Sequence, residues 1–112
     1  MGSFAASSVV LVRFPFSDLS QTKLRPAVVI ADSGRGDWLL CQITSNAYGD
    51  PKAVQISDSD FKSGSLRCVS HARPLKLFTA HDSLIFSQIG VLRDESLRRI
   101  VDVIVQFVRP DH

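Results

Sequence analysis

The chain has 112 residues, of which 45% are hydrophobic and 21% are charged, with 13 lysines and arginines against 11 acidic residues. This size and composition are typical of one folded domain and exclude a disordered chain. The net charge of +2 neither requires nor excludes a polyanionic partner. We expect a single domain over residues 1–112, with residues 1–7 flexible.

No feature of a secreted or membrane protein stands out in the sequence. No apolar run approaches the roughly 18 residues of a membrane-spanning helix, and the start, MGSFAASS, lacks the basic region and apolar core of a signal peptide. Cys41 and Cys68 form no CxxC pair and no disulfide framework, which favours a reducing compartment. We therefore expect a cytoplasmic protein that makes no membrane contact.

Six short runs rich in β-branched or aromatic residues are separated by polar turns, as expected for an antiparallel sheet. The run AVVIA is apolar at every position, which predicts a strand covered on both faces. Pro26 precedes this run and lacks a backbone N–H, so we expect it to be the first strand residue. The predicted strands are 9–14, 27–31, 38–44, 53–56, 66–78 and 83–92.

The connections between these runs are predicted from their polar and glycine-rich composition. Residues 16–24 read as a long loop, 32–37 as a turn and 57–65 as a turn-rich link. The run 66–78 contains Pro74, and it is either one strand or two strands broken near that proline.

The last part of the chain has the apolar period of a helix. Asp94 and Glu95 suit a first helical turn, where the helix dipole favours acidic residues, and Pro110 suits the end. Strands about ten residues apart followed by one helix indicate a mainly β fold, a small antiparallel barrel with a packed C-terminal helix. Apolar residues recur at three- and four-residue spacing at Leu97, Ile100, Val101, Ile104 and Val108.

No motif for a metal or cofactor is present. The histidines are His71, His81 and His112, and none has a cysteine or acid at a usual ligand spacing. The chain has no P-loop, no GxGxxG and no GxSxG. We expect no metal and no cofactor.

The chemistry that remains lies at the ends of two predicted strands. Arg25 stands before the second strand, and Thr44 with Ser45 stands at the end of the third. In an antiparallel hairpin these positions are neighbours, and an arginine fork with hydroxyls suits a phosphate group. Two other interpretations stay open: a surface ion pair for the arginine, and a turn cap for Thr44 and its neighbours.

The chain resembles the PemK/MazF family of toxins from toxin–antitoxin systems. Four pieces carry the resemblance in the family's order, from Val9 to about Val108: VVLVRFPFSD, LRPAVVIAD, LLCQITSN and LRDESLRRIVDVIVQFV. The resemblance implies an SH3-like barrel with a C-terminal helix, a homodimer and a cognate antitoxin. It also implies that operator DNA would be bound only through the antitoxin. Many members of the family cut single-stranded RNA without a metal, through attack of the ribose 2′-hydroxyl on the adjacent phosphate.

The resemblance also assigns roles to residues. Arg25 would act as an acid or stabilise the phosphate, and Thr44 would position it. Many relatives carry an Asp-Gln pair where this chain has Ser70 and His71 in the segment VSHAR. His71 could replace the proton-transfer group, since histidine changes charge near neutral pH; a structural role for it stays open.

A second set of residues is predicted to contact RNA. The set combines cations that could line a basic groove with aromatic and hydroxyl side chains near loops. For the cations, an ordinary solvated surface is the alternative. The set consists of Phe16, Ser17, Lys23, Tyr48, Arg67, Arg73 and Lys76.

Two other functions remain open. One is a non-catalytic SH3-like module that binds nucleic acid or protein. The other is a toxin-like relative that keeps the fold and the dimer but regulates transcription together with its antitoxin.

Overall fold

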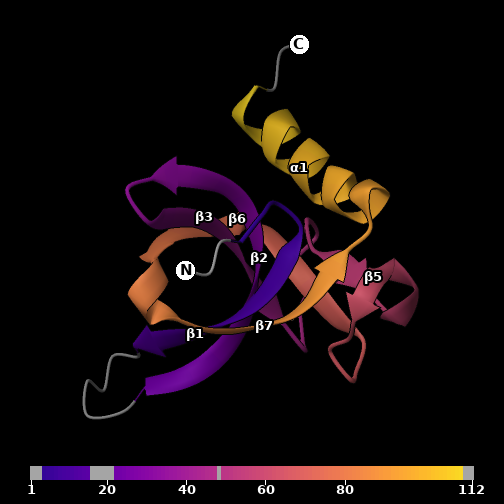
Figure 1. Ribbon diagram of the computed structural model, residues 1–112. Coiled ribbons are helices and arrows are strands. Elements are labelled where there is room, and N and C mark those ends of the chain that lie inside the picture. The colour runs from indigo at the N-terminus through magenta and orange to yellow at the C-terminus, as the bar shows by residue number, and fades with distance from the viewer. Residues whose placement is uncertain (1–3, 16–21, 48, 110–112) are drawn as a thin grey trace.

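One antiparallel sheet of seven strands forms most of the protein and curls into a half-barrel, with a helix at its end (Figure 1). The structure is a computed structural model, and it describes residues 4–15, 22–47 and 49–109. The strands lie in the order β4-β6-β3-β2-β1-β7-β5. The elements are β1 (Ser8–Pro15), β2 (Thr22–Gly34), β3 (Asp37–Thr44), β4 (Val54–Ile56), the 3-10 helix η1 (Asp58–Asp60), β5 (Phe61–Gly64), β6 (Ser70–His81), the 3-10 helix η2 (Asp82–Leu84), β7 (Ile85–Leu92) and α1 (Asp94–Val108).

The second strand is longer than predicted, and this corrects two expectations. Lys23 and Leu24 belong to β2 and not to a loop, whereas residues 16–21 lie outside the described residues. Pro26 is not the first strand residue, because it pairs with Leu11 of β1 inside the strand. The β2–β3 register begins one residue later, at Ala27. Pro26 therefore has a paired neighbour strand on one side only, where a missing N–H is tolerated.

The turn between β2 and β3 explains why the strands come so close. Arg35 and Gly36 form a two-residue connection, and both have positive φ angles, of 58° and 82°. Two positive φ values are the signature of the tight hairpin turn whose twist matches that of the strands. Two register shifts follow the turn, between Gly34 and Asp32 and between Ala31 and Val29, and after them Val28 lies opposite Cys41.

Two other connections differ from the prediction. The run 66–78, for which one or two strands were expected, contains one strand: β6 begins only at Ser70, continues through Pro74 to His81, and its register with β3 shifts between Cys41 and Ile43. The link 57–65 contains η1 and the edge strand β5, which pairs with β7. Gly64 permits that pairing, because a Cβ atom there would lie 2.2 Å from the Ile89 carbonyl oxygen.

The apolar run of β2 is covered on both faces from Ala27 to Ile30, as predicted, whereas its last residue, Ala31, is exposed. Val28 belongs to the first core cluster, and Ala27 and Val29 belong to the second. The first cluster also contains Val9, Cys41, Ile43, Ile56, Phe61, Ala72, Leu92 and Ile100. The second contains Val10, Val12, Trp38, Leu40 and Ala80. Trp38 is a packing residue, since it is buried and its ring meets Phe4 edge to face.

The C-terminal helix is confirmed, with its first half on the sheet. Ile100 is fully buried, and Leu97 and Ile104 pack against the first core cluster. Val108, predicted on the apolar face, is 67% exposed, because the last turns of α1 extend beyond the sheet (Figure 1). Pro110 lies outside the described residues. In the described parts of the chain, no helix is long and apolar enough to cross a membrane.

Candidate functional site

The strand registers bring three of the four predicted catalytic residues onto one face of the sheet. Thr44 at the end of β3 lies directly opposite His71 of β6. The β2–β3 pairing ends with Ala27 opposite Gln42, and Arg25 and Thr44 lie two residues beyond these partners on the same face of their strands. Directly opposite residues of an antiparallel pair point to the same face, with Cβ atoms about 5 Å apart. Thr44 and His71 are therefore neighbours, and Arg25 lies on the same face of the adjacent strand β2, just beyond its pairing with β3.

This group extends to a fourth strand through a residue that the sequence reasoning did not select. Gln55 of β4 lies opposite His71 on the other side of β6. We call Arg25, Thr44, His71 and Gln55 the polar row. The sequence signal for Gln55 was weak, because a short strand with one exposed amide looks like any solvated edge.

The polar row lies at the end of the second core cluster. Ile43 and Ala72 oppose each other and belong to the first cluster, so their neighbours Thr44 and His71 point to the other face. On that face of β2 the side chains change from Val29 through Ala27 to Arg25. The sheet is thus apolar inside the barrel and polar where its strands end.

Two members of the row have local contacts that bear on their chemistry. The Thr44 hydroxyl donates to the Asn46 carbonyl (3.1 Å) and accepts from the Asn46 N–H (3.2 Å), so Thr44 does cap the turn. The Nδ1 atom of His71 is buried and has no hydrogen-bond partner among the described residues. A buried polar atom without a partner costs free energy and is often explained by function.

Ser45 follows Thr44 directly, is exposed, and stands just beyond the end of β3. Lys23 lies two residues before Arg25, so its side chain is on the same face of β2. Lys76 lies on β6, where it lines a hollow together with Gln42, Leu77 and Phe78. A hydroxyl group and two ammonium groups are thus carried on or just beyond the same strands as the polar row, near its members.

The other predicted RNA contacts are distributed differently. Arg73 is in an ion pair with Asp50, with 2.9 Å between Nε and Oδ2. Arg67 has a positive φ angle of 71° and lines a separate hollow beside Ser57 and Ser59. Phe16, Ser17 and Tyr48 lie outside the described residues.

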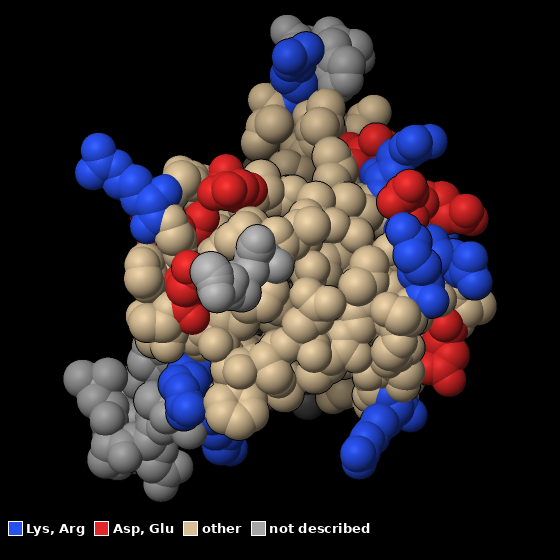
Figure 2. Space-filling view, viewed as in Figure 1, with Lys and Arg blue, Asp and Glu red and all other residues tan. Residues whose placement is uncertain are grey.

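Ion pairing also sets the charge on the acid beside Arg73. The hydrogen bond from the Arg73 side chain, helped by the Lys52 N–H, lowers the pKa of the Asp50 carboxyl below its ordinary value. Asp50 is thus negative at neutral pH and offsets the positive charge of Arg73. In the face that Figure 2 shows, lysines and arginines stand in small groups at the rim, and several of them lie beside acidic residues.

Two other kinds of chemistry, a cysteine nucleophile and a bound metal ion, have little support in the described residues. Burial raises the pKa of the Cys41 thiol to about 12, so it is protonated at neutral pH and is a poor nucleophile. In the described residues no group of three histidine, cysteine or acidic side chains is arranged to hold a metal ion.

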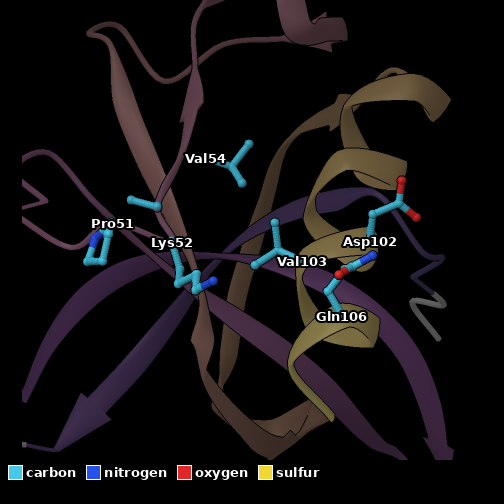
Figure 3. A pocket seen from close by; sticks show the side chains of 7 residues that line it. Pro51, Lys52, Val54, Asp102, Val103 and Gln106 are labelled. Carbon is cyan, nitrogen blue, oxygen red and sulfur yellow. The ribbon is translucent and has the colours of Figure 1, made fainter. Parts of the chain in front are cut away.

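A further hollow is lined by none of the four residues of the polar row. It has a volume of about 370 Å³ and separates the loop before β4 from one side of α1. Figure 3 shows Lys52 and Val54 facing Val103 and Gln106 of the helix across this space. It contains none of the predicted catalytic residues.

The fold matches solved structures of toxins. The chain is similar to MazF in two structures from Deinococcus radiodurans. For the MazE–MazF complex (Form-II) the TM-score is 0.74 at 19% identity, covering 93% of this chain and 94% of that chain. For MazF (Form-I) it is 0.73 at 19% identity, covering 96% and 98%. An endoribonuclease in complex with its cognate antitoxin, from a mycobacterial species, has a TM-score of 0.72 at 12% identity, covering 96% and 95%.

These similarities define the class of the fold, a MazF-like half-barrel with a C-terminal helix. A family model assigns the sequence further: residues 6–108 match the PemK-like, MazF-like toxins of type II toxin–antitoxin systems. The chain belongs to this family. No curated protein sequence matches it.

Proposed function

We propose that the protein is the toxin of a type II toxin–antitoxin system and a metal-independent endoribonuclease for single-stranded RNA. The observation that carries this proposal is the pairing of Thr44 with His71, with Arg25 on the same face of the adjacent strand β2. Family membership supports the same reaction.

The reaction needs little from the protein, because the nucleophile belongs to the substrate. The ribose 2′-oxygen bonds to phosphorus, its proton passes to His71, and the bond from phosphorus to the 5′-oxygen breaks. The leaving oxygen takes a proton from Arg25 or from water. The products are a 2′,3′-cyclic phosphate and a 5′-hydroxyl end. Arg25 and the hydroxyls of Thr44 and Ser45 stabilise the charge on the phosphate oxygens.

The test is digestion of a long RNA in EDTA by the wild type and by Arg25→Ala, followed by mapping of the ends. We expect discrete cuts with 5′-hydroxyl ends that the variant does not make. A folded wild type, free of antitoxin, that cuts none of several RNAs would overturn the proposal.

One observation favours a second candidate, a non-catalytic module of the same fold that binds RNA. The Thr44 hydroxyl is already engaged in its turn with Asn46, so phosphate binding competes with that contact. A pure binder would lose affinity gradually with salt when Arg25 is removed, and it would leave the RNA intact.

We further propose a homodimer and an antitoxin as partners. Two of the structures to which the chain is similar are complexes: MazE–MazF, and the mycobacterial endoribonuclease with its cognate antitoxin. An acidic and hydrophobic antitoxin tail that covers Arg25 would silence the site, and operator DNA would be bound through the antitoxin. Light scattering of the toxin alone, and inhibition of cleavage by the co-expressed neighbouring gene product, test these two points.

A further inference from the structure

A small hollow opens on the sheet next to the polar row. It has a volume of about 180 Å³ and is lined by Gln42 of β3 and by Lys76, Leu77 and Phe78 of β6. Pockets that enclose drug-sized ligands have roughly 300–1,000 Å³. This hollow therefore suits one planar group and not a whole oligonucleotide.

The register places the hollow one step from the proposed reaction centre. Gln42 precedes Thr44 by two residues, so both side chains are on the same face, about 7 Å apart along β3. The β3–β6 register shifts at this point, between Cys41 and Ile43. The extra residues of β6 between Ala72 and Leu77 widen the space beside Gln42, which explains why a hollow forms here.

The side chains of the hollow combine three kinds of contact. Gln42 is half-buried, and its amide, a donor and an acceptor in one plane, makes no hydrogen bond within the described part of the chain. Phe78 is half-buried against the second core cluster and lends the hollow an aromatic surface. Lys76 is exposed and adds a positive charge at the rim.

We propose that this hollow is a subsite for one base of single-stranded RNA, next to the phosphate held at the polar row. Gln42 reads the hydrogen-bonding edge of the base, Phe78 contacts its face, and Lys76 binds the adjoining phosphate. Proteins read single-stranded RNA by this combination of amide hydrogen bonds, aromatic surface and cations. The inference rests on the proposed function and assigns a role in substrate specificity to Gln42. The strand pattern alone did not single out this residue.

The first test compares base preference. An RNA with a randomised segment is digested in EDTA by the wild type, Gln42→Leu and Gln42→Glu, and the cut ends are sequenced. We expect each variant still to cut, with its preference at one position beside the cut reduced or changed by about 10-fold. Gln88→Leu makes the same chemical change at an exposed residue of β7 and should keep the wild-type preference.

The second test does not depend on cleavage. Each of the four ribonucleoside 5′-monophosphates is titrated into the protein, and the backbone amide signals are followed by NMR. We expect one nucleotide to shift the signals of Gln42 and Phe78, and this shift to be lost in Gln42→Leu. Gln42→Glu keeps the shape of the side chain and serves if the leucine variant does not fold.

The outcomes separate the subsite from the proposed function. A wild type that cuts, with a preference unchanged in both Gln42 variants, overturns the subsite and leaves the nuclease intact. A wild type that cuts no RNA overturns the nuclease, and the titration then decides the subsite. Localised shifts support it as a base-binding site, and their absence overturns it.

Discussion

At the scale of single residues, the polar row contains one side chain whose contacts are incomplete. His71 buries its Nδ1 atom without a hydrogen-bond partner among the described residues. A buried nitrogen of this kind costs about 1–3 kcal/mol. His81 differs, because its Nδ1 accepts from the Ser83 N–H at 3.2 Å and caps η2. Replacing His71 and replacing His81 should therefore have opposite effects on the stability of the fold.

We expect His71→Phe to leave the free energy of unfolding unchanged or raise it by about 1 kcal/mol, while RNA cleavage falls about 100-fold or more. His81→Phe should lower the free energy of unfolding by about 1 kcal/mol, as the loss of a cap does, and keep the cleavage rate. Urea titrations and initial cleavage rates measure both. A stable, fully active His71→Phe protein would remove His71 from the mechanism.

Thr44 serves both its turn and the polar row, and two substitutions separate these roles. Thr44→Ser keeps the hydroxyl, so we expect cleavage within about 10-fold of the wild type. Thr44→Val keeps the shape but loses the donor, so we expect about a 100-fold fall in kcat/KM. Rates on a short labelled RNA measure the difference, with thermal melts to show that both variants fold. Equal rates for Thr44→Val and Thr44→Ser would show that Thr44 only stabilises the turn and has no part in cleavage.

At the scale of elements, Asp60 joins η1 to the start of α1. Its carboxylate accepts hydrogen bonds from the Ser96 hydroxyl (2.7 Å), the Arg99 guanidinium (2.8 Å) and the Ser57 N–H (2.8 Å). Partial burial works against ionisation, but these hydrogen bonds outweigh it and lower the pKa of Asp60 below its ordinary value. The charged form is therefore the one that stabilises the junction.

We expect Asp60→Asn to lower the free energy of unfolding by about 1–3 kcal/mol at neutral pH. A lowered folded-state pKa means that the stabilisation is present above the unfolded value, near 4, and is lost as the pH falls through the folded value. The difference between wild type and Asp60→Asn should thus be constant from pH 6 to 8 and shrink below about pH 4. Asp58→Asn, an exposed residue of the same turn, is the matched control. A difference that does not depend on pH would contradict the role of the charge.

The elements also show how far the sequence leads. The sequence was sufficient to predict the buried strand of β2, the glycine-containing hairpin turn and helix α1, because each of these depends on a local pattern. The strand β5 was missed, because its serine and glycine pair with β7 only through a close backbone approach at Gly64. Pro26 was misjudged and the effect of Pro74 was left open, since neighbouring strands and a register shift decide whether a proline is tolerated. Arg25 and Thr44 could be found because a hairpin relates them, whereas Gln42 and Gln55 needed the order of the strands.

At the scale of the whole molecule, the net charge of +2 says little about RNA binding, and the distribution of charges says more. Acidic residues neutralise several cations locally: Asp50 is paired with Arg73 and Asp60 with Arg99. Lys76 forms no direct salt bridge among the described residues, although its charge also acts on Asp50, and it stands at the rim of the proposed base subsite. Affinity for RNA should therefore depend on individual pairs and not on the total charge.

This distribution predicts opposite effects of two single substitutions on the salt dependence of RNA binding. Each phosphate contact on a single strand adds about 0.7 to the slope of log affinity against log salt. Lys76→Gln should lower affinity at low salt and reduce the slope by about 0.7. Asp50→Asn releases Arg73 from its ion pair, so it should raise affinity and increase the slope by a similar amount.

The measurement is fluorescence anisotropy with a labelled 2′-O-methyl RNA, whose blocked 2′-oxygens cannot attack, so that binding is followed without cleavage. Lys62→Gln removes the same charge from β5, at the opposite edge of the sheet from β4 and β6, and should change the slope little. If Lys62→Gln and Lys76→Gln had equal effects, binding would follow net charge and not a surface on β6. If Asp50→Asn did not raise affinity, Arg73 would be a structural partner of Asp50 and not a latent RNA contact. Since both cations lie on β6, an increase for Asp50→Asn together with a decrease for Lys76→Gln would trace the path of the RNA along that strand, past the polar row.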